Sequence, residues 1–161
     1  MNSDKFIFVS VKNQKLYCYS SKRLLGSYQV STSKNGLGEL RNSECTPRGW
    51  HKIHAVIGKG AAINSVFVAR ELTGEIYGPL LSCQFPHRDW ILTRIIQLAG
   101  LEKGRNQDGQ VDTLSRYIYL HGIPETTDIA VPGSHGCIRM HNRDLVKLAK
   151  WVTVGALVCI E

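Results

Sequence analysis

A long apolar run is missing from the start of this sequence. The first residues, Met1 to Lys5, lead into only four consecutive apolar residues, Phe6 to Val9. The apolar segment of a secretory signal needs about 7–15 residues, and a membrane-spanning helix needs about 20. We therefore expect no membrane span. We expect a cytoplasmic protein if Met1 is the natural start of the chain, and a periplasmic protein otherwise.

Paired cysteines are missing as well. The five cysteines are an odd number, and no two of them form a Cys-x-x-Cys pair. This pattern disfavours both a disulfide framework and a four-cysteine zinc site. Free thiols are typical of a reducing compartment. We expect Cys18 and Cys159, which lie in strand-like runs, to be buried in the core.

The sequence also lacks a continuous basic segment, although its net charge is +7. Its longest uninterrupted basic run is the pair Lys22-Arg23. Nucleic-acid-binding domains concentrate their basic residues on one face or stripe, so we predict no nucleic-acid partner. Scattered positive charge remains compatible with a small anionic substrate.

The composition is that of a globular protein rich in β-structure. Its 161 residues, of which 43% are hydrophobic and 20% charged, are enough for one domain with a sizeable core. Fifteen glycines and many short apolar runs favour strands separated by turns. No repeat or linker divides the chain, so we predict a single domain over residues 1–161. The predicted strands cover residues 5–11, 15–20, 24–32, 50–57, 65–70, 117–121 and 156–160.

Two segments have the apolar spacing of a helix. In residues 90–98, apolar side chains recur at spacings of one, three and four, and Gly100 follows as a helix stop. In residues 143–152 the apolar side chains share one face, and Asn142 is placed to cap the helix.

A long excursion separates two groups of predicted strands. It covers residues 71–116 and is rich in turns. A connection of this length is more often functional than idle. We predict that it forms one wall of a substrate cleft, with Tyr77 and Arg94 as substrate-binding residues.

The most informative feature is the heptapeptide from Ser134 to Met140, SHGCIRM. A thiol is mostly protonated at neutral pH, so a nucleophilic cysteine needs a nearby base. Cys137 is the candidate nucleophile, and His121, which ends an apolar run, is the candidate base. The carbonyl of Gly122 is the nearest acceptor that can orient the His121 ring. Gly136 permits a tight turn, and we expect its N–H and that of Cys137 to stabilise an oxyanion.

Three other side chains of the heptapeptide have more than one interpretation. His135 either lines the oxyanion pocket or contacts substrate, or it holds the loop in shape. Ser134 is a candidate substrate-binding residue, and its hydroxyl alternatively bonds His121 or His135 or serves the turn. Arg139 either grips a substrate carboxylate or tethers the loop.

The segments SHGCIRM and YIYLHG together resemble the active-site motif of the YkuD-type L,D-transpeptidases. In that motif a histidine and a spacer precede Ser/Thr-His-Gly-Cys, an apolar residue and often Asn or Arg. The residues that match it are His121, Ser134, His135, Gly136, Cys137 and Arg139. The first two predicted strands, VST at 30–32, TPRG at 46–49 and DWILTR at 89–94 also resemble this family, so the resemblance covers nearly the whole chain. Unlike most members, the sequence shows no signal peptide, lipid anchor or peptidoglycan-binding module.

The resemblance implies a mainly β fold, a sandwich or barrel-like domain with about two helices, and no cofactor. It implies that the cysteine attacks the carbonyl between the third residue of a peptidoglycan stem and the following D-alanine, which leaves. The acyl group then passes to water, or to an amine in a 3–3 crosslink or lipoprotein link. Signal-less members resemble cytoplasmic L,D-carboxypeptidases of murein recycling. We therefore predict hydrolysis of soluble muropeptides, with an exported crosslinking enzyme as the alternative.

Two further hypotheses are weaker. Zinc bound by His121, His135, Cys137 and His141 would require an awkward His-x-Cys spacing for tetrahedral ligation, so we predict no metal. The other is a non-catalytic binder of peptidoglycan or nucleic acid, and loss of activity with retained binding in the Cys137→Ser variant would argue against it.

Overall fold

The computed structural model describes residues 4–161, so the first three residues of the predicted domain lie outside the described part. The chain is mainly β with two α-helices, as predicted. The strands are β1 (Lys5–Ser10), β2 (Lys15–Ser20), β3 (Arg23–Ser31), β4 (Gly49–Ile57), β5 (Ser65–Val68), β6 (Glu71–Ile76), β7 (Ile91–Gly100), β8 (Tyr119–Gly122), β9 (Ile138–Met140) and β10 (Leu157–Ile160). The α-helices are α1 (Pro79–Gln84) and α2 (Asn142–Trp151), and a short 3-10 helix covers Gly109–Val111.

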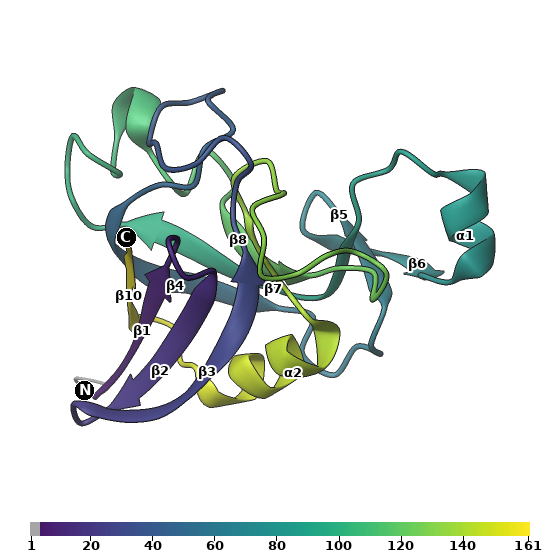
Figure 1. Cartoon of the computed structure of the whole chain (residues 1–161), viewed down its shortest axis with the longest axis horizontal. Coiled ribbons are helices and arrows are strands. Elements are labelled where there is room, and N and C mark those ends of the chain that lie inside the picture. Colours follow the sequence, from purple (N-terminus) through teal and green to yellow (C-terminus); the bar gives the residue numbers. More distant parts are fainter. Residues whose placement is uncertain (1–3) are drawn as a thin grey trace.

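The strands form one sheet that closes on itself. Their order is β4-β10-β1-β2-β3-β9-β8-β7-β5-β6, and β4 also pairs with β7. This second pairing closes the strands from β4 to β7 into a barrel. Figure 1 shows β5, β6 and α1 projecting from one side of that barrel, with α2 lying beneath it. The two parallel pairs are β1–β10 and β8–β9.

The predicted helix over residues 90–98 is wrong. That segment belongs to β7, whose residues from Leu92 to Gly100 are all buried. A strand covered on both faces has apolar residues at nearly every position, so their spacing also fits a helix. The six-residue helix α1 was not predicted, because a segment of that length is too short to show a helical period.

The main core lies on the inward face of the sheet and beneath α2. Leu145 and Leu148 of α2 pack with Leu120 of β8 and with Ile138 and Met140 of β9. Because side chains of a strand alternate between its faces, the neighbours of these core residues in β8 and β9 point the other way. Cys18 and Cys159 are buried, as predicted. This alternation decides which side chains reach the site described below.

Helix α2 begins at Asn142, but Asn142 does not cap it. The N-cap position is His141, and no side chain caps the helix there. Asn142 is instead buried, and its amide donates to the carbonyl of Ile123 at 2.8 Å and to Oδ1 of Asn64 at 3.1 Å. Its Oδ1 accepts from the hydroxyl of Thr93. The side chain therefore ties the start of α2 to β7 and to the loop after β8.

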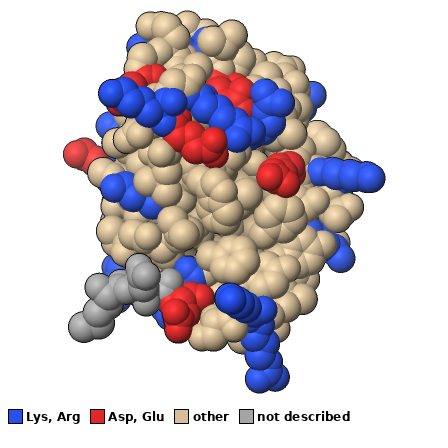
Figure 2. All heavy atoms as spheres, turned by 90° about the vertical axis from the view of Figure 1, so that its left-hand side faces the viewer, with Lys and Arg blue, Asp and Glu red and all other residues tan. Residues whose placement is uncertain are grey.

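Charges of both signs alternate on the face turned to the viewer in Figure 2, without one continuous basic patch. Two of the ion pairs in the structure, Arg48–Glu39 and Arg105–Glu102, have nitrogen–oxygen distances of 2.7 and 2.9 Å. Among residues 4–161, no helix combines the length and the apolar character needed to cross a membrane.

Candidate active site

The candidate nucleophile and base lie on one face of the β8–β9 pair. In this parallel pair, His121 is opposite Arg139 and Leu120 is opposite Ile138. Cys137 directly precedes β9, so it shares the face of Arg139 and His121. The opposite face carries Leu120 and Ile138, which belong to the main core. The fifteen residues between the two candidates therefore loop out and return to the same patch.

Cys137 is half-buried beside Phe67, Ile95 and Tyr119. Its thiol lies 3.4 Å from the carbonyl oxygen of Tyr117, to which it donates. The N–H of Tyr119 donates to the same sulfur at 3.3 Å. Within the described part of the chain, no hydrogen bond joins this sulfur to His121. The backbone of residues 117–119 therefore engages the resting thiol.

The His121 ring is fixed by the acceptor that the sequence suggested. His121 is 2% exposed, and its Nδ1 lies 2.8 Å from the carbonyl oxygen of Gly122. A carbonyl can only accept, so Nδ1 carries the hydrogen in this contact. In the neutral ring, Nε2 is then the basic nitrogen. The prediction that Gly122 orients this ring is confirmed.

Burial keeps both groups uncharged at neutral pH. Desolvation raises the pKa of the Cys137 thiol to about 11, partly opposed by the N–H of Tyr119. Desolvation likewise lowers the pKa of His121, against the opposing effect of its bond to Gly122. The resting pair is therefore a thiol and a neutral imidazole rather than a thiolate and an imidazolium. A proton must move between them as the sulfur attacks.

The turn before Cys137 depends on Ser134, Gly136 and Thr46. The Ser134 hydroxyl donates to the carbonyl of Cys137 and accepts from the N–H of Gly136, at 2.5 and 3.2 Å. The Thr46 hydroxyl donates to the carbonyl of Gly136 at 2.9 Å. Ser134 is 1% exposed, so its turn-forming interpretation is confirmed and its proposed substrate contact is wrong. The Gly136 N–H is occupied, which leaves that of Cys137 as the predicted oxyanion donor.

We expect Gly136→Ala to destabilise the protein by about 1–3 kcal/mol, the usual cost of a strained backbone conformation. Gly136 has φ +121°, and an added Cβ would lie 3.2 Å from both the carbonyl oxygen of Cys45 and Cδ1 of Ile118. Denaturant unfolding measures the loss. The matched control is Gly133→Ala, where the nearest atom, Nη1 of Arg139, is 3.6 Å from an added Cβ. Equal stabilities of the two variants would contradict this account of the turn.

Asp89, which is not among the predicted site residues, connects His135 and Arg139. Its carboxylate lies 3.6 Å from Nδ1 of His135 and 3.3 Å from Nη2 of Arg139. Arg139 also donates to the carbonyl of Gly133 at 3.0 Å. These bonds confirm that Arg139 tethers the loop before Cys137. The only sequence signal for Asp89 was its place in the DWILTR segment.

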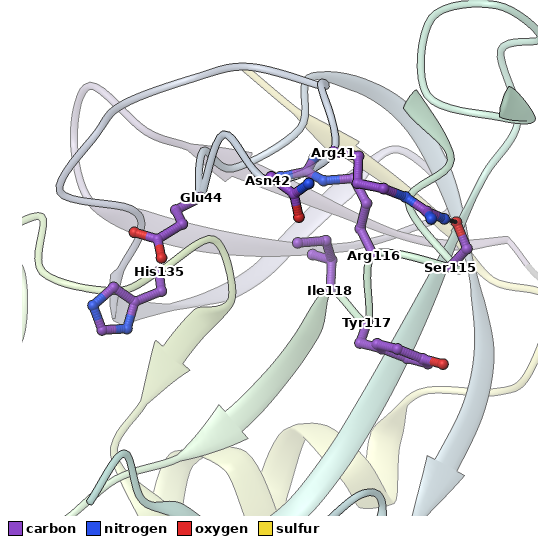
Figure 3. Close-up of a pocket in the computed structure, with 8 residues that line it drawn as sticks. All are labelled: Arg41, Asn42, Glu44, Ser115, Arg116, Tyr117, Ile118 and His135. Carbon is purple, nitrogen blue, oxygen red and sulfur yellow. Dashed lines mark hydrogen bonds between the residues drawn. The ribbon is translucent and has the colours of Figure 1, made fainter. Parts of the chain in front are cut away.

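A cavity of about 320 Å³ opens beside this loop. Its lining residues come from three segments that are distant in the chain: Arg41, Asn42, Glu44, Ser115, Arg116, Tyr117, Ile118 and His135. Figure 3 shows His135 and Glu44 on one side of it and the two arginines on the other. Arg116 donates to the carbonyls of Gly38, Glu39 and Cys45. Its guanidinium therefore holds the loop of residues 38–45 and is not free to face the cavity.

The excursion contributes to the site only in part. Asp89 and Trp90 line a small pocket together with Arg139, and Tyr77 packs edge-on against Trp90 with ring centroids 5.0 Å apart. Arg94, by contrast, lies with residues of α2 on the opposite side of the sheet. The prediction that Arg94 binds substrate near Cys137 is therefore wrong. The β7 strand turns alternate side chains to opposite faces, which a helix would not have done.

A metal centre finds no support in the side-chain positions. Within residues 4–161, no group of three or more His, Cys, Asp and Glu side chains is placed to hold a metal ion. His121 donates to a carbonyl, His135 faces Asp89, and the Cys137 thiol faces a backbone carbonyl. The arrangement instead has the parts of a nucleophilic site: a thiol, an oriented base and a tight turn.

Comparisons with known proteins agree with this geometry. The family model described as YkuD, the L,D-transpeptidase catalytic domain, matches residues 4–160. No curated protein matches the chain. An L,D-transpeptidase from Mycobacterium smegmatis is 16% identical over 99% of this chain and 59% of its own, with a TM-score of 0.57.

Two other solved structures are similar in fold. L,D-transpeptidase 3 from Mycobacterium tuberculosis, solved with a faropenem-derived adduct, is 14% identical over 99% of this chain and 60% of its own, with a TM-score of 0.60. An L,D-transpeptidase from Enterococcus faecium is 13% identical over 98% of this chain and 50% of its own, with a TM-score of 0.58. The chain thus spans half to three fifths of the length of these structures.

Proposed function

This chain belongs to the YkuD family of L,D-transpeptidase catalytic domains, and from that premise we propose that it transfers acyl groups through Cys137. The proposed substrate is the peptide bond between the third residue of a peptidoglycan stem and the following D-alanine. The observation that carries the proposal is the placement of Cys137 and an oriented His121 on one face of β8 and β9.

In the proposed acylation, Nε2 of His121 takes the thiol proton while the sulfur attacks the carbonyl carbon. The carbon–nitrogen bond to D-alanine then breaks, and the leaving amine takes the proton from His121. A thioester remains on Cys137. The neutral resting pair favours this coupled transfer, because neither group is charged before substrate binds. The Cys137 N–H is the proposed oxyanion donor.

We place part of the stem peptide in the cavity beside His135. The stem bears carboxylates, and Arg41 lines the cavity with its side chain exposed. Arg41 is held there by one bond of 3.1 Å to the Ser115 hydroxyl, which leaves further guanidinium hydrogens for a carboxylate. His135, whose side chain is 47% exposed, is the histidine that meets the substrate in this arrangement.

The proposed main acceptor is water, which makes the reaction an L,D-carboxypeptidase reaction. Water reaches an open cavity at a far higher concentration than any soluble amine, and no binding site is needed to concentrate it. His121 would take a proton from that water as it attacks the thioester, releasing tripeptide and the thiol. The alternative acceptor is the amine of a second stem, which gives a 3–3 crosslink.

We expect a soluble disaccharide-tetrapeptide to be converted mainly to tripeptide and free D-alanine. Mass spectrometry in H₂¹⁸O checks both the products and the acceptor, because hydrolysis places one ¹⁸O in the new carboxylate. A tetrapeptide ending in L-alanine is the control substrate and should remain intact. Crosslinked dimer as the principal product at millimolar substrate would favour the alternative acceptor. Absence of any acyl-enzyme or released D-alanine would contradict the proposed function itself.

A further inference from the structure

A groove of about 760 Å³ lies on the α2 side of the sheet, away from Cys137. Its apolar wall is formed by Val56 of β4, Val146 of α2, and Val152 and Val154 after that helix. Val154 is 66% exposed although it is apolar. The groove is thus an open apolar surface in a separate place from the cavity beside His135.

The cations at this groove are Arg94, Lys59 and Lys150. Arg94 is 8% exposed, yet residues 4–161 hold no carboxylate within ion-pair distance of it. Its Nη1 donates to the carbonyls of Ala61 and Thr93.

Burying a guanidinium without a counter-charge is costly. Burial lowers the pKa of Arg94, and no acidic side chain offsets that effect. The other edge of the guanidinium has donors to spare. Arg94 is therefore placed to take an anion.

We propose that this groove binds an amphipathic carboxylate, with the carboxylate on Arg94 and an aliphatic chain along the valine wall. A planar guanidinium matches a carboxylate in two parallel hydrogen bonds. Lys59 and Lys150 are both exposed, and they add positive charge at the rim. The apolar wall disfavours a ligand charged along its whole length, such as a nucleic acid.

The site is independent of the proposed acyl transfer. Arg94 precedes Ile95, which pairs with His121 across β7 and β8. Ile95 packs beside Cys137, whereas Arg94 joins the groove with Val146 of α2. Ligand in the groove would therefore occupy the face opposite the thiol.

Isothermal titration with dodecanoate, below its micelle concentration, tests the proposal. We expect one dodecanoate to bind per chain. Dodecyltrimethylammonium has a similar tail and the opposite charge, and acetate has the head group without the tail, so neither should bind. Binding of dodecyltrimethylammonium as tight as that of dodecanoate would overturn the proposal. The Cys137→Ser variant should bind dodecanoate like the natural chain, which separates this test from the proposed function.

Matched variants locate the bound carboxylate. Arg94→Gln should weaken dodecanoate binding at least about tenfold, because it removes a charged hydrogen-bond donor. Lys150→Glu should weaken it several-fold, whereas Lys147→Glu on the same helix should not. Since Arg94 also bonds two carbonyls and its replacement can unfold the chain, the lysine pair keeps the test decisive. Equal binding by the two lysine variants would overturn the assignment.

A second pair tests the apolar wall. Val154→Asp places a carboxylate on the wall at a position that is already 66% exposed, so folding should be preserved. Val68→Asp makes the same change on β5, where the valine is 53% exposed. We expect only Val154→Asp to abolish dodecanoate binding. Unchanged binding by Val154→Asp would show that the tail does not lie there.

Discussion

The Cys137→Ser variant is expected to lose acyl-enzyme formation by about 10⁴–10⁶-fold, the range for removal of a nucleophile. A hydroxyl is much less acidic than a thiol, so the neutral, oriented His121 that can accept the thiol proton would activate serine poorly. Intact-mass spectrometry of the protein with tetrapeptide, or with a carbapenem as a reactive acyl donor, measures the adduct.

The other cysteines provide the control for this experiment. Cys83 is exposed, whereas Cys18 and Cys159 are buried. A simple alkylating reagent should therefore label Cys83 readily, while the carbapenem adduct should map to Cys137. If exposure alone decided which cysteine reacts, the carbapenem would modify Cys83. Reaction at Cys137 instead requires activation by the oriented His121. A carbapenem adduct on Cys83 in the natural chain would remove the basis for the proposed nucleophile.

The His121→Ala variant should lower acylation at pH 7 by about 10²–10⁴-fold, as expected for loss of a general base. The pKa of the Cys137 thiol is raised to about 11, so little thiolate exists at pH 7 without help. Acylation by the variant should therefore rise about tenfold per pH unit up to that pKa. Single-turnover kinetics between pH 6 and 10 measure both effects.

The natural chain should depend on pH in a different way. Burial lowers the pKa of His121, so its imidazole stays neutral over the neutral range and gains a proton only under acid conditions. Activity should be nearly constant around neutrality and at about pH 6.5, the ordinary histidine pKa, and should fall only at pH values lower than that. The exposed His54→Ala variant is the control and should keep this profile. A His121→Ala variant with the natural profile would transfer the role of base to His135.

Much of the candidate site could be predicted because its signal is local. Cys137 and Gly136 belong to one heptapeptide, and the Gly122 carbonyl is the neighbour of His121 in the chain. Asp89 could not be predicted in the same way, since its contacts with His135 and Arg139 join segments about fifty residues apart. Only the closed sheet brings these segments together.

The fold shows the same division between local and long-range information. The hairpin of β1 and β2 agrees with its predicted ranges, because alternation and a short turn are encoded within sixteen residues. The β7 strand was mistaken for a helix because both its faces are covered by other parts of the chain. Burial of both faces depends on the other parts of the chain that pack against β7, so the sequence of β7 alone does not reveal it.

Closure of the barrel depends on strands β9 and β10. Strand β9 lies between β3 and β8, and β10 lies between β1 and β4. The barrel therefore lacks two of its strands until residues 138–160 have paired with their neighbours. Pairs such as Phe6 with Leu157 join residues that are almost the whole chain apart in sequence. Such long-range closure is slow compared with helical folding. Cys137 directly precedes β9, so it lies beside His121 only once β9 has paired with β8, and a complete site requires this long-range pairing.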